Sequence, residues 1–149
     1  MKNAQDELQA MLDAGQDLPF RVEKYILQTI WPPEEGKKLE TVATVRAWIG
    51  ENLQHTAGSG VGPVHALDIA LKRAVAAFFP KIEEIVLTGY AVKAENTGSN
   101  APVLCTAKFR CGKNSWTSVA EHTNQDHAAW MAVLDGYMYG IMSAEEAHK

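Results

Sequence analysis

The stretch Thr56–Leu71, "TAGSGVGPVHALDIAL", marks the point where a strand pattern gives way to a helix pattern. Three glycines within five residues precede Pro63, which suits a first helical turn because its missing N–H has no helical partner there. Free backbone N–H groups at such a helix start favour a carboxylate or a phosphate. The glycines are equally compatible with a tight strand-to-helix reversal alone. The stretch therefore predicts a strand followed by a helix, and it leaves both roles of the loop open.

Working outward from this stretch, the same order of elements occurs twice. Upstream, alternating segments predict strands at 20–31, 39–49 and 53–57, with a hairpin turn at Gly50, and apolar spacings of three and four predict a helix at 63–79. Downstream, the corresponding predictions are strands at 82–95, 101–111 and 115–119 and a helix at 125–142. A short helix at 3–14, a remnant linker or a docking arm, precedes both sets.

A shift of 62 residues superposes the two halves. It places Gly50 on Gly112, Asn52 on Asn114 and His65 on His127. We therefore expect an α+β fold of duplicated βββα units, with antiparallel sheets each covered by one helix, or one continuous sheet with both helices on one face. Chance similarity of two hairpin-plus-helix segments is the alternative. The expected organisation is an N-terminal helix and linker (1–18), one duplicated domain (19–142, repeats about 20–79 and 82–141) and a polar tail (143–149).

The composition excludes several classes of partner. The 149 residues carry a net charge of -4 with acids and bases interspersed, so no basic face for nucleic acid and no polybasic membrane anchor is expected. No apolar run approaches the roughly 18 residues of a membrane span, and the N-terminus lacks the apolar core of a signal peptide. The sequence predicts a cytoplasmic protein.

No motif for catalysis, a cofactor or a metal is found. The glycine stretch is neither a P-loop nor G-x-G-x-x-G opening a helix. His122 and His127 are five residues apart and do not share one helix face, so solvated or capping roles are expected rather than a metal site. Cys105 and Cys111 on one strand would lie about 20 Å apart, too far for a disulfide, and are expected to be buried thiols.

Tryptophan and histidine side chains are expected in structural roles. Trp48, Trp116 and Trp130 are expected in the core or at an interface, and His65 is expected on the surface or at an interface. An independent enzyme using the glycine loop has no acid, base or nucleophile to support it.

Several segments together resemble a known family. They are Phe20–Tyr25 (FRVEKY), Ala43–Arg46 (ATVR), His55–Asp68 (HTAGSGVGPVHALD), Phe79-Pro80, Ile85–Val92 (IVLTGYAV), Ser115-Trp116 and Ala129-Trp130. This set is similar to the C-terminal regulatory domain of the 2-isopropylmalate synthase and citramalate synthase family, and is closer to the citramalate synthase branch. The resemblance implies a duplicated βββα module that dimerises and binds an end-product branched-chain amino acid, leucine or isoleucine, to inhibit a separate catalytic barrel.

The resemblance also implies a ligand site. The loop residues Gly60, Val61, Gly62 and Pro63 would hold the polar end of the amino acid. Its aliphatic side chain would contact Val64, Leu87, Tyr90, Ala94, Ala101 and Val103. Leu87 and Tyr90 have opposite parity on a regular strand, so both reach one pocket only through a β-bulge or at a strand end.

The chain departs from the family pattern at several points. Val61 stands where the family usually has Asn or Asp, and Gly89 stands where it usually has Asp; Val119–His122 and Asn124–Asp126 also differ. Valine offers no side-chain acceptor for an ammonium group. The alternative to amino-acid sensing is therefore a free-standing dimerisation or interaction module with a degenerate or altered ligand site.

The family's catalytic barrel sets a further expectation. A (β/α)₈ barrel needs about 250 residues, so this chain is not expected to condense acetyl-CoA with a keto acid by itself. It is either a fragment of a longer enzyme or a free-standing module that acts on a catalytic barrel in cis or in trans. No cofactor is expected.

Overall fold

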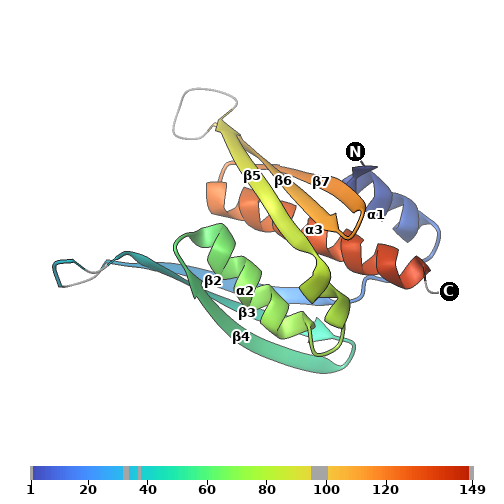
Figure 1. Ribbon diagram of the computed structural model, residues 1–149, viewed down its shortest axis with the longest axis horizontal. Helices are drawn as coiled ribbons and strands as arrows, with labels where there is room; N and C mark the ends of the chain where they lie inside the picture. The colour runs from blue at the N-terminus through green and yellow to red at the C-terminus, as the bar shows by residue number, and fades with distance from the viewer. Residues whose placement is uncertain (1, 32–33, 37, 95–100, 148–149) are drawn as a thin grey trace. The chain divides into compact units, whose positions relative to one another are not determined.

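The computed structural model describes residues 2–31, 34–36, 38–94 and 101–147 (Figure 1). The chain divides into two compact units. The first-repeat unit comprises residues 19–80, and the second-repeat unit comprises residues 1–18 and 81–149. Each unit is described by itself.

The first-repeat unit is a three-stranded antiparallel sheet covered by one helix. The strands β2 (Arg21–Ile30), β3 (Glu40–Ile49) and β4 (Asn52–Gly60) lie in the order β2-β3-β4, and α2 (Pro63–Val75) packs against β3 and β4 (Figure 1). Alternate residues of β3 turn inward and are buried with the apolar side of α2. These buried residues include Ala43, Val45, Ala47, Ile49, Leu67 and Leu71.

The second-repeat unit has the same plan. The strands β5 (Val86–Ala94), β6 (Val103–Cys111) and β7 (Asn114–His122) are antiparallel neighbours, and α3 (Gln125–Ala147) packs on β6 and β7. Phe109 of β6 forms the centre of this core, since its ring stacks on Trp116 at 6.0 Å and meets Tyr137 edge-on at 5.1 Å. Cys105, Ala107 and Phe109 are buried on one face, as the alternation predicted.

An N-terminal segment completes the second sheet. The strand β1 (Lys2–Asn3) pairs in parallel with β7, which gives the order β1-β7-β6-β5. The helix α1 (Ala4–Asp13) follows, with Asn3 accepting a capping hydrogen bond from the Asp6 N–H, and packs against α3 and β7. The β5, β6 and β7 pairings are antiparallel, as expected. The parallel pairing of β1 is an addition that was not predicted, because its two residues give too short a sequence pattern to detect.

Local geometry confirms the repeated βββα units. Gly50 and Gly112 both have φ +61 and both open two-residue hairpin loops, as glycine does in a type II′ turn. The first strand of each unit carries a register shift, between Val22 and Lys24 in β2 and between Leu87 and Gly89 in β5. The helices α2 and α3 pack on two separate sheets rather than on one continuous sheet.

Several expected boundaries were wrong. The helix α2 ends at Val75 rather than at 79. The Phe78 and Phe79 N–H groups both donate to the Val75 carbonyl oxygen in a turn, and Pro80 disfavours helix in Phe79. The start of the segment predicted as strand 82–95 is a 3₁₀ helix, η1 (Pro80–Glu84), and residue 95 lies outside the described residues. The helix α3 continues to Ala147, because Ser143–Ala147 contains alanine and glutamate and no helix breaker. Residues 143–147, expected in a polar tail, are therefore helical.

Candidate functional site

The glycine stretch is mostly strand rather than loop. Gly58 and Gly60 belong to β4, and neither has a positive φ. A Cβ added at Gly58 would lie 2.7 Å from the backbone nitrogen of Ala70 and 2.8 Å from Cγ2 of Ile69. The helix α2 thus crosses β4 too closely for any side chain at position 58. This glycine is explained by helix-on-strand packing rather than by a ligand or a turn.

Two hydrogen bonds hold α2 in this close position. The Thr56 hydroxyl donates to the carbonyl oxygen of Ala70 at 2.7 Å, and Arg73 Nη1 donates to the carbonyl oxygen of Ala57 at 2.7 Å. At Gly60, a Cβ would lie 2.7 Å from Nδ1 of His65. The exposed His65 of the first turn of α2 therefore packs against Gly60 at the end of β4.

Gly62 and Pro63 form the helix start that the sequence predicted. Gly62 is the N-cap with extended backbone and no side-chain cap, and its carbonyl oxygen accepts from the Ala66 N–H at 3.1 Å. A Cβ at Gly62 would meet nothing within 4 Å. Val61 is 82% exposed, whereas Val64 is only 6% exposed and belongs to the core of its unit. Gly62 has no side chain, so the N-cap position presents only backbone N–H groups to a polar ligand.

The remaining predicted residues lie on β5, on β6 and just before β6. Leu87 is paired with Phe109, Gly89 with Lys108 and Tyr90 with Ala107, so Thr88 is one extra residue in β5. Directly opposed residues in antiparallel strands point to the same face. Phe109 and Ala107 are both buried on the α3 side, and therefore Leu87 and Tyr90 both point to that side. The β-bulge that is needed for Leu87 and Tyr90 to share a face is therefore present.

Beyond the bulge, the same face continues along the edge strand. Ala94 is paired with Val103 and has the parity of Tyr90, and Ala101 precedes the start of β6 and is half-buried. Because α3 packs on β6 and β7, the edge strand β5 keeps much of this face open, and Tyr90 is 53% exposed. Val92 was not among the predicted site residues, but it lies on this face, since it is paired with the buried Cys105, and it is 36% exposed. Its even spacing from Tyr90 was the available signal.

The structure thus forms two separate sets of predicted residues. Leu87, Tyr90, Ala94 and Val103 share one apolar face within the second-repeat unit, with Ala101 adjacent to it along the chain. Gly60–Val64 belong to the first-repeat unit. We refer to Leu87, Tyr90, Val92, Ala94 and Val103 as the β5 face.

The histidines serve as part of a helix cap. His122 at the end of β7 accepts a hydrogen bond from the Asn124 N–H at its Nδ1, and the Asn124 side chain accepts from the His127 N–H. The two imidazole rings meet edge-on with centroids 4.7 Å apart, closer than their spacing suggested. Among the described residues no group of three potential metal ligands is found. His122 therefore lies in the cap region of α3, as expected, whereas His127 contributes its backbone N–H there.

The cysteines and tryptophans are placed much as predicted, with two qualifications. Cys105 is buried, and burial raises the pKa of its thiol, but Cys111 is only partly buried. Trp116 and Trp130 are in the core. Trp48 lies on the outer face of β3, opposite the α2 side, and donates from Nε1 to the Glu23 carboxylate at 2.8 Å.

A partly buried polar network joins α1 to the second-repeat core. The Gln5 amide donates from Nε2 to Ser118 Oγ at 2.8 Å and to Asp135 Oδ2 at 3.2 Å, and its Oε1 accepts from the Val119 N–H at 3.0 Å. Burial raises the pKa of Asp135, although the hydrogen bond from Gln5 acts in the opposite direction. The Gln5 side chain thus continues the pairing of β1 along the edge of β7.

Within the described ranges, no helix is long and apolar enough to cross a membrane.

Comparisons with known proteins identify the relatives of this chain. Residues 5–141 match the family model described as the LeuA allosteric (dimerisation) domain. The chain is 37% identical over 106 residues to an (R)-citramalate synthase of Aquifex aeolicus, covering 70% of this chain and 20% of that protein. It is 33% identical over 116 residues to the Geobacter sulfurreducens (R)-citramalate synthase and 35% identical over 130 residues to that of Streptomyces coelicolor, covering 75% and 84% of this chain.

These matches define the extent of the similarity. The chain covers 22% and 23% of the latter two proteins, so it spans about a fifth of the length of the curated relatives it matches. The matched region takes in both βββα units and most of α1. The chain belongs to the LeuA allosteric (dimerisation) domain family, on the side of the citramalate synthases.

Proposed function

We propose that this chain is a regulatory domain that dimerises and binds a branched-chain amino acid, isoleucine or leucine, for feedback inhibition of a citramalate synthase-type acyltransferase. The observation that carries the proposal is the β5 face. It is an apolar surface on the inner side of an edge strand, and its largest side chain, Tyr90, is 53% exposed. Fully burying a Leu or Ile side chain is worth about 1.5–3 kcal/mol, so such a face supplies real affinity for an aliphatic ligand.

We propose that each set of residues suits a different part of an amino acid. We propose that the branched aliphatic side chain lies beside the Tyr90 ring, against the small Ala94 and Ala101 and against Val92 and Val103. The uncapped backbone N–H groups after Gly62 suit the α-carboxylate, since the positive end of the α2 dipole lies there. We propose that the carboxylate is held by Gly60, Val61, Gly62 and Pro63. We propose that the aliphatic side chain is held by Leu87, Tyr90, Ala94, Ala101 and Val103. Val64, being buried, supports the helix start.

Inhibition then follows from linkage. A ligand that binds one arrangement of the two subunits more tightly shifts the population toward it. The effect on a catalytic barrel cannot exceed the difference in ligand affinity between the two arrangements. On this proposal the chain has no acyltransferase activity of its own, and such activity in the purified chain would contradict it.

A second function is favoured by one specific observation. Val61 is 82% exposed and has no hydrogen-bond acceptor in its side chain, and Gly89 has no side chain at all. A domain without amine recognition would join subunits without sensing an amino acid. This alternative keeps the dimer and loses the ligand.

Sedimentation equilibrium distinguishes the two functions. The chain is measured alone and with isoleucine, leucine or valine at equal concentration. The regulatory proposal predicts a dimer whose dissociation constant falls with isoleucine or leucine, because a ligand preferring the dimer stabilises it by mass action. A dimer that responds to none of the three amino acids supports the second function, and a monomer at all concentrations contradicts both.

A further inference from the structure

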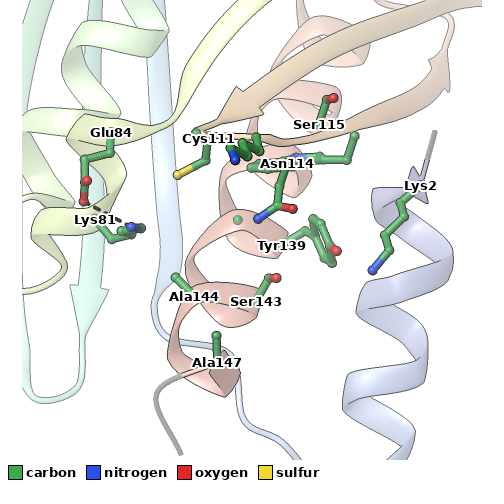
Figure 2. A pocket seen from close by; sticks show the side chains of 14 residues that line it. Lys2, Lys81, Glu84, Cys111, Asn114, Ser115, Tyr139, Ser143, Ala144 and Ala147 are labelled. Atoms are coloured by element: carbon green, nitrogen blue, oxygen red, sulfur yellow. Dashed lines mark ion pairs between the residues drawn. The ribbon is translucent and has the colours of Figure 1, made fainter.

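A large cavity lies at the end of the second-repeat unit where β6 meets β7. Its volume is about 1120 Å³, slightly above the usual range of small-molecule sites, and residues of four segments line it. They come from β1, from η1, from the Cys111–Trp116 hairpin and from the last turns of α3 (Figure 2). In Figure 2, Lys2 and Tyr139 lie on one side, Lys81 and Glu84 on the other, and Asn114 between them.

The charge of this cavity is opposite to that of the whole chain. The chain has a net charge of -4, but the lining contains Lys2, Lys81 and Lys113 and a single acid, Glu84. The Lys81 ammonium is 3.4 Å from the Glu84 carboxylate. Within the described residues, Lys2 and Lys113 have no carboxylate within ion-pairing distance. Two lysines are thus left to attract an anion.

Neutral hydrogen-bond donors accompany the lysines. The Asn114 amide and the Ser143 hydroxyl both line the cavity (Figure 2). Trp116 supplies a rigid wall rather than a donor, because its Nε1 already donates to the carbonyl oxygen of Gly136 at 2.9 Å and its ring meets Tyr139 edge-on at 5.3 Å. Cations with neutral donors on one concave surface are the chemistry that holds phosphate or carboxylate groups.

The parts that form the cavity lie largely outside the repeat. The residue of the first hairpin that corresponds to Lys113 is Glu51, so the charge at this position is opposite in the two repeats. Ser143 lies in the part of α3 that α2 does not have, since α2 ends at Val75. Lys2 belongs to β1, which has no counterpart in the first-repeat sheet. Segments that the βββα plan does not require therefore converge on one basic concavity.

The cavity is also distinct from the proposed amino-acid site. Val103 of the β5 face begins β6 and Cys111 of the cavity ends it, which separates them by about 26 Å along the strand. We infer that this cavity binds a small molecule with at least two negative charges, a phosphorylated compound or a polycarboxylate. The inference stands independently of the function proposed above.

Cys111 provides a probe inside the cavity. Its thiol is partly buried and lines the cavity, whereas Cys105 is buried in the core. The experiment measures the rate at which the full chain is alkylated by the neutral reagent iodoacetamide, with Cys111→Ser confirming which thiol reacts. Inorganic pyrophosphate and citrate are each titrated at constant ionic strength. The inference predicts that at least one of them slows the alkylation of Cys111 saturably, in the low millimolar range or below.

Charge variants determine where the anion binds. Lys113→Glu is expected to raise the half-protecting concentration at least about fivefold, since hydrogen bonds to charged groups contribute more than neutral ones. The matched control is Lys108→Glu, an exposed β6 lysine outside the cavity lining that makes the same change in net charge. Protection by pyrophosphate alone assigns a phosphorylated ligand, protection by citrate alone a polycarboxylate, and protection by both a site selective for charge. No protection by either anion, or equal weakening by Lys108→Glu, overturns the inference.

Discussion

Leu87 and Tyr90 point to the same face of the second sheet although three positions separate them, because Thr88 is an extra residue in β5 opposite the step from Phe109 to Lys108. A regular strand would direct the two side chains to opposite faces. The bulge lies on an edge strand, where such irregularities are common and re-aim side chains. It therefore creates the apolar face on which the proposed function depends.

Deletion of Thr88 tests this role of the bulge. Removing it leaves Leu87 and Tyr90 two positions apart, so a regular strand keeps both on one face without a bulge, and we expect saturable isoleucine binding to be retained. The matched control is Thr88→Ala, which keeps the extra residue and loses only the hydrogen bond from the Thr88 hydroxyl to the Lys108 carbonyl oxygen at 3.2 Å. Calorimetric titration of both variants is the measurement. Loss of binding in the deletion variant, with binding retained by Thr88→Ala, would contradict the account that the bulge acts only by placing both side chains on one face.

The same substitution is expected to act in opposite directions at two glycines of the "GSGVG" stretch. Gly58→Ser places a Cβ 2.7 Å from the Ala70 backbone nitrogen and is expected to lower the free energy of unfolding by about 1–3 kcal/mol. Gly62→Ser places its Cβ in open space at an N-cap, where serine is a preferred residue, and is expected to leave stability unchanged or slightly increased. Urea denaturation measures both. Equal destabilisation at the two positions would contradict the close approach of α2 to β4.

Gln5 is expected to fix α1 on the second-repeat unit. Gln5→Ala removes the partner of the Val119 N–H and of Ser118 Oγ, and should cost about 1–3 kcal/mol in the free energy of unfolding. Gln9→Ala on the same helix loses one exposed bond, from Gln9 Nε2 to Asp13 Oδ1, and should cost less than about 0.5 kcal/mol. Chemical denaturation compares the two variants. If they are equally stable, the network does not hold the helix.

Asp135 gives the stability a dependence on pH. Burial raises the pKa of this carboxyl above its usual value of 3.8, so the folded state binds the proton more tightly than the unfolded state does. Its contribution is therefore fully present below pH 3.8 and is lost as the pH rises through the folded-state pKa. Asp135→Asn cannot ionise, and its stability relative to the wild type should increase from pH 4 to pH 7. A difference between the two proteins that is constant over this range would refute the assignment.

Much of the fold could be predicted because its signals are local. Alternation along β3 and β6, the glycines of the two hairpins and the Gly62-Pro63 helix start are all readable within a few residues. The bulge in β5 was inferred from parity, since the resemblance required Leu87 and Tyr90 to reach one pocket. Val92 was missed although the same alternation includes it.

The remaining features depend on contacts between distant residues. The docking of α1 depends on Gln5 meeting Ser118 and Asp135, more than a hundred residues away in the sequence. The reason for Gly58 lies in the approach of Ala70, which no local pattern reveals. The basic cavity combines Lys2 with residues near the other end of the chain. Such features arise from tertiary packing, and propensity and periodicity do not carry that information.

The most direct test of the central claim is isothermal titration of the chain with isoleucine, with leucine and valine as competitors, repeated on Tyr90→Ala. Tyr90 is 53% exposed, so its truncation should leave the fold intact, and near-wild-type thermal unfolding of the variant verifies this. The account predicts saturable binding of isoleucine or leucine by the wild type and at least about tenfold weaker binding by Tyr90→Ala, as for loss of a well-packed aromatic contact. No binding heat with any of the three amino acids from a folded dimer would contradict it, leaving a module that only joins subunits.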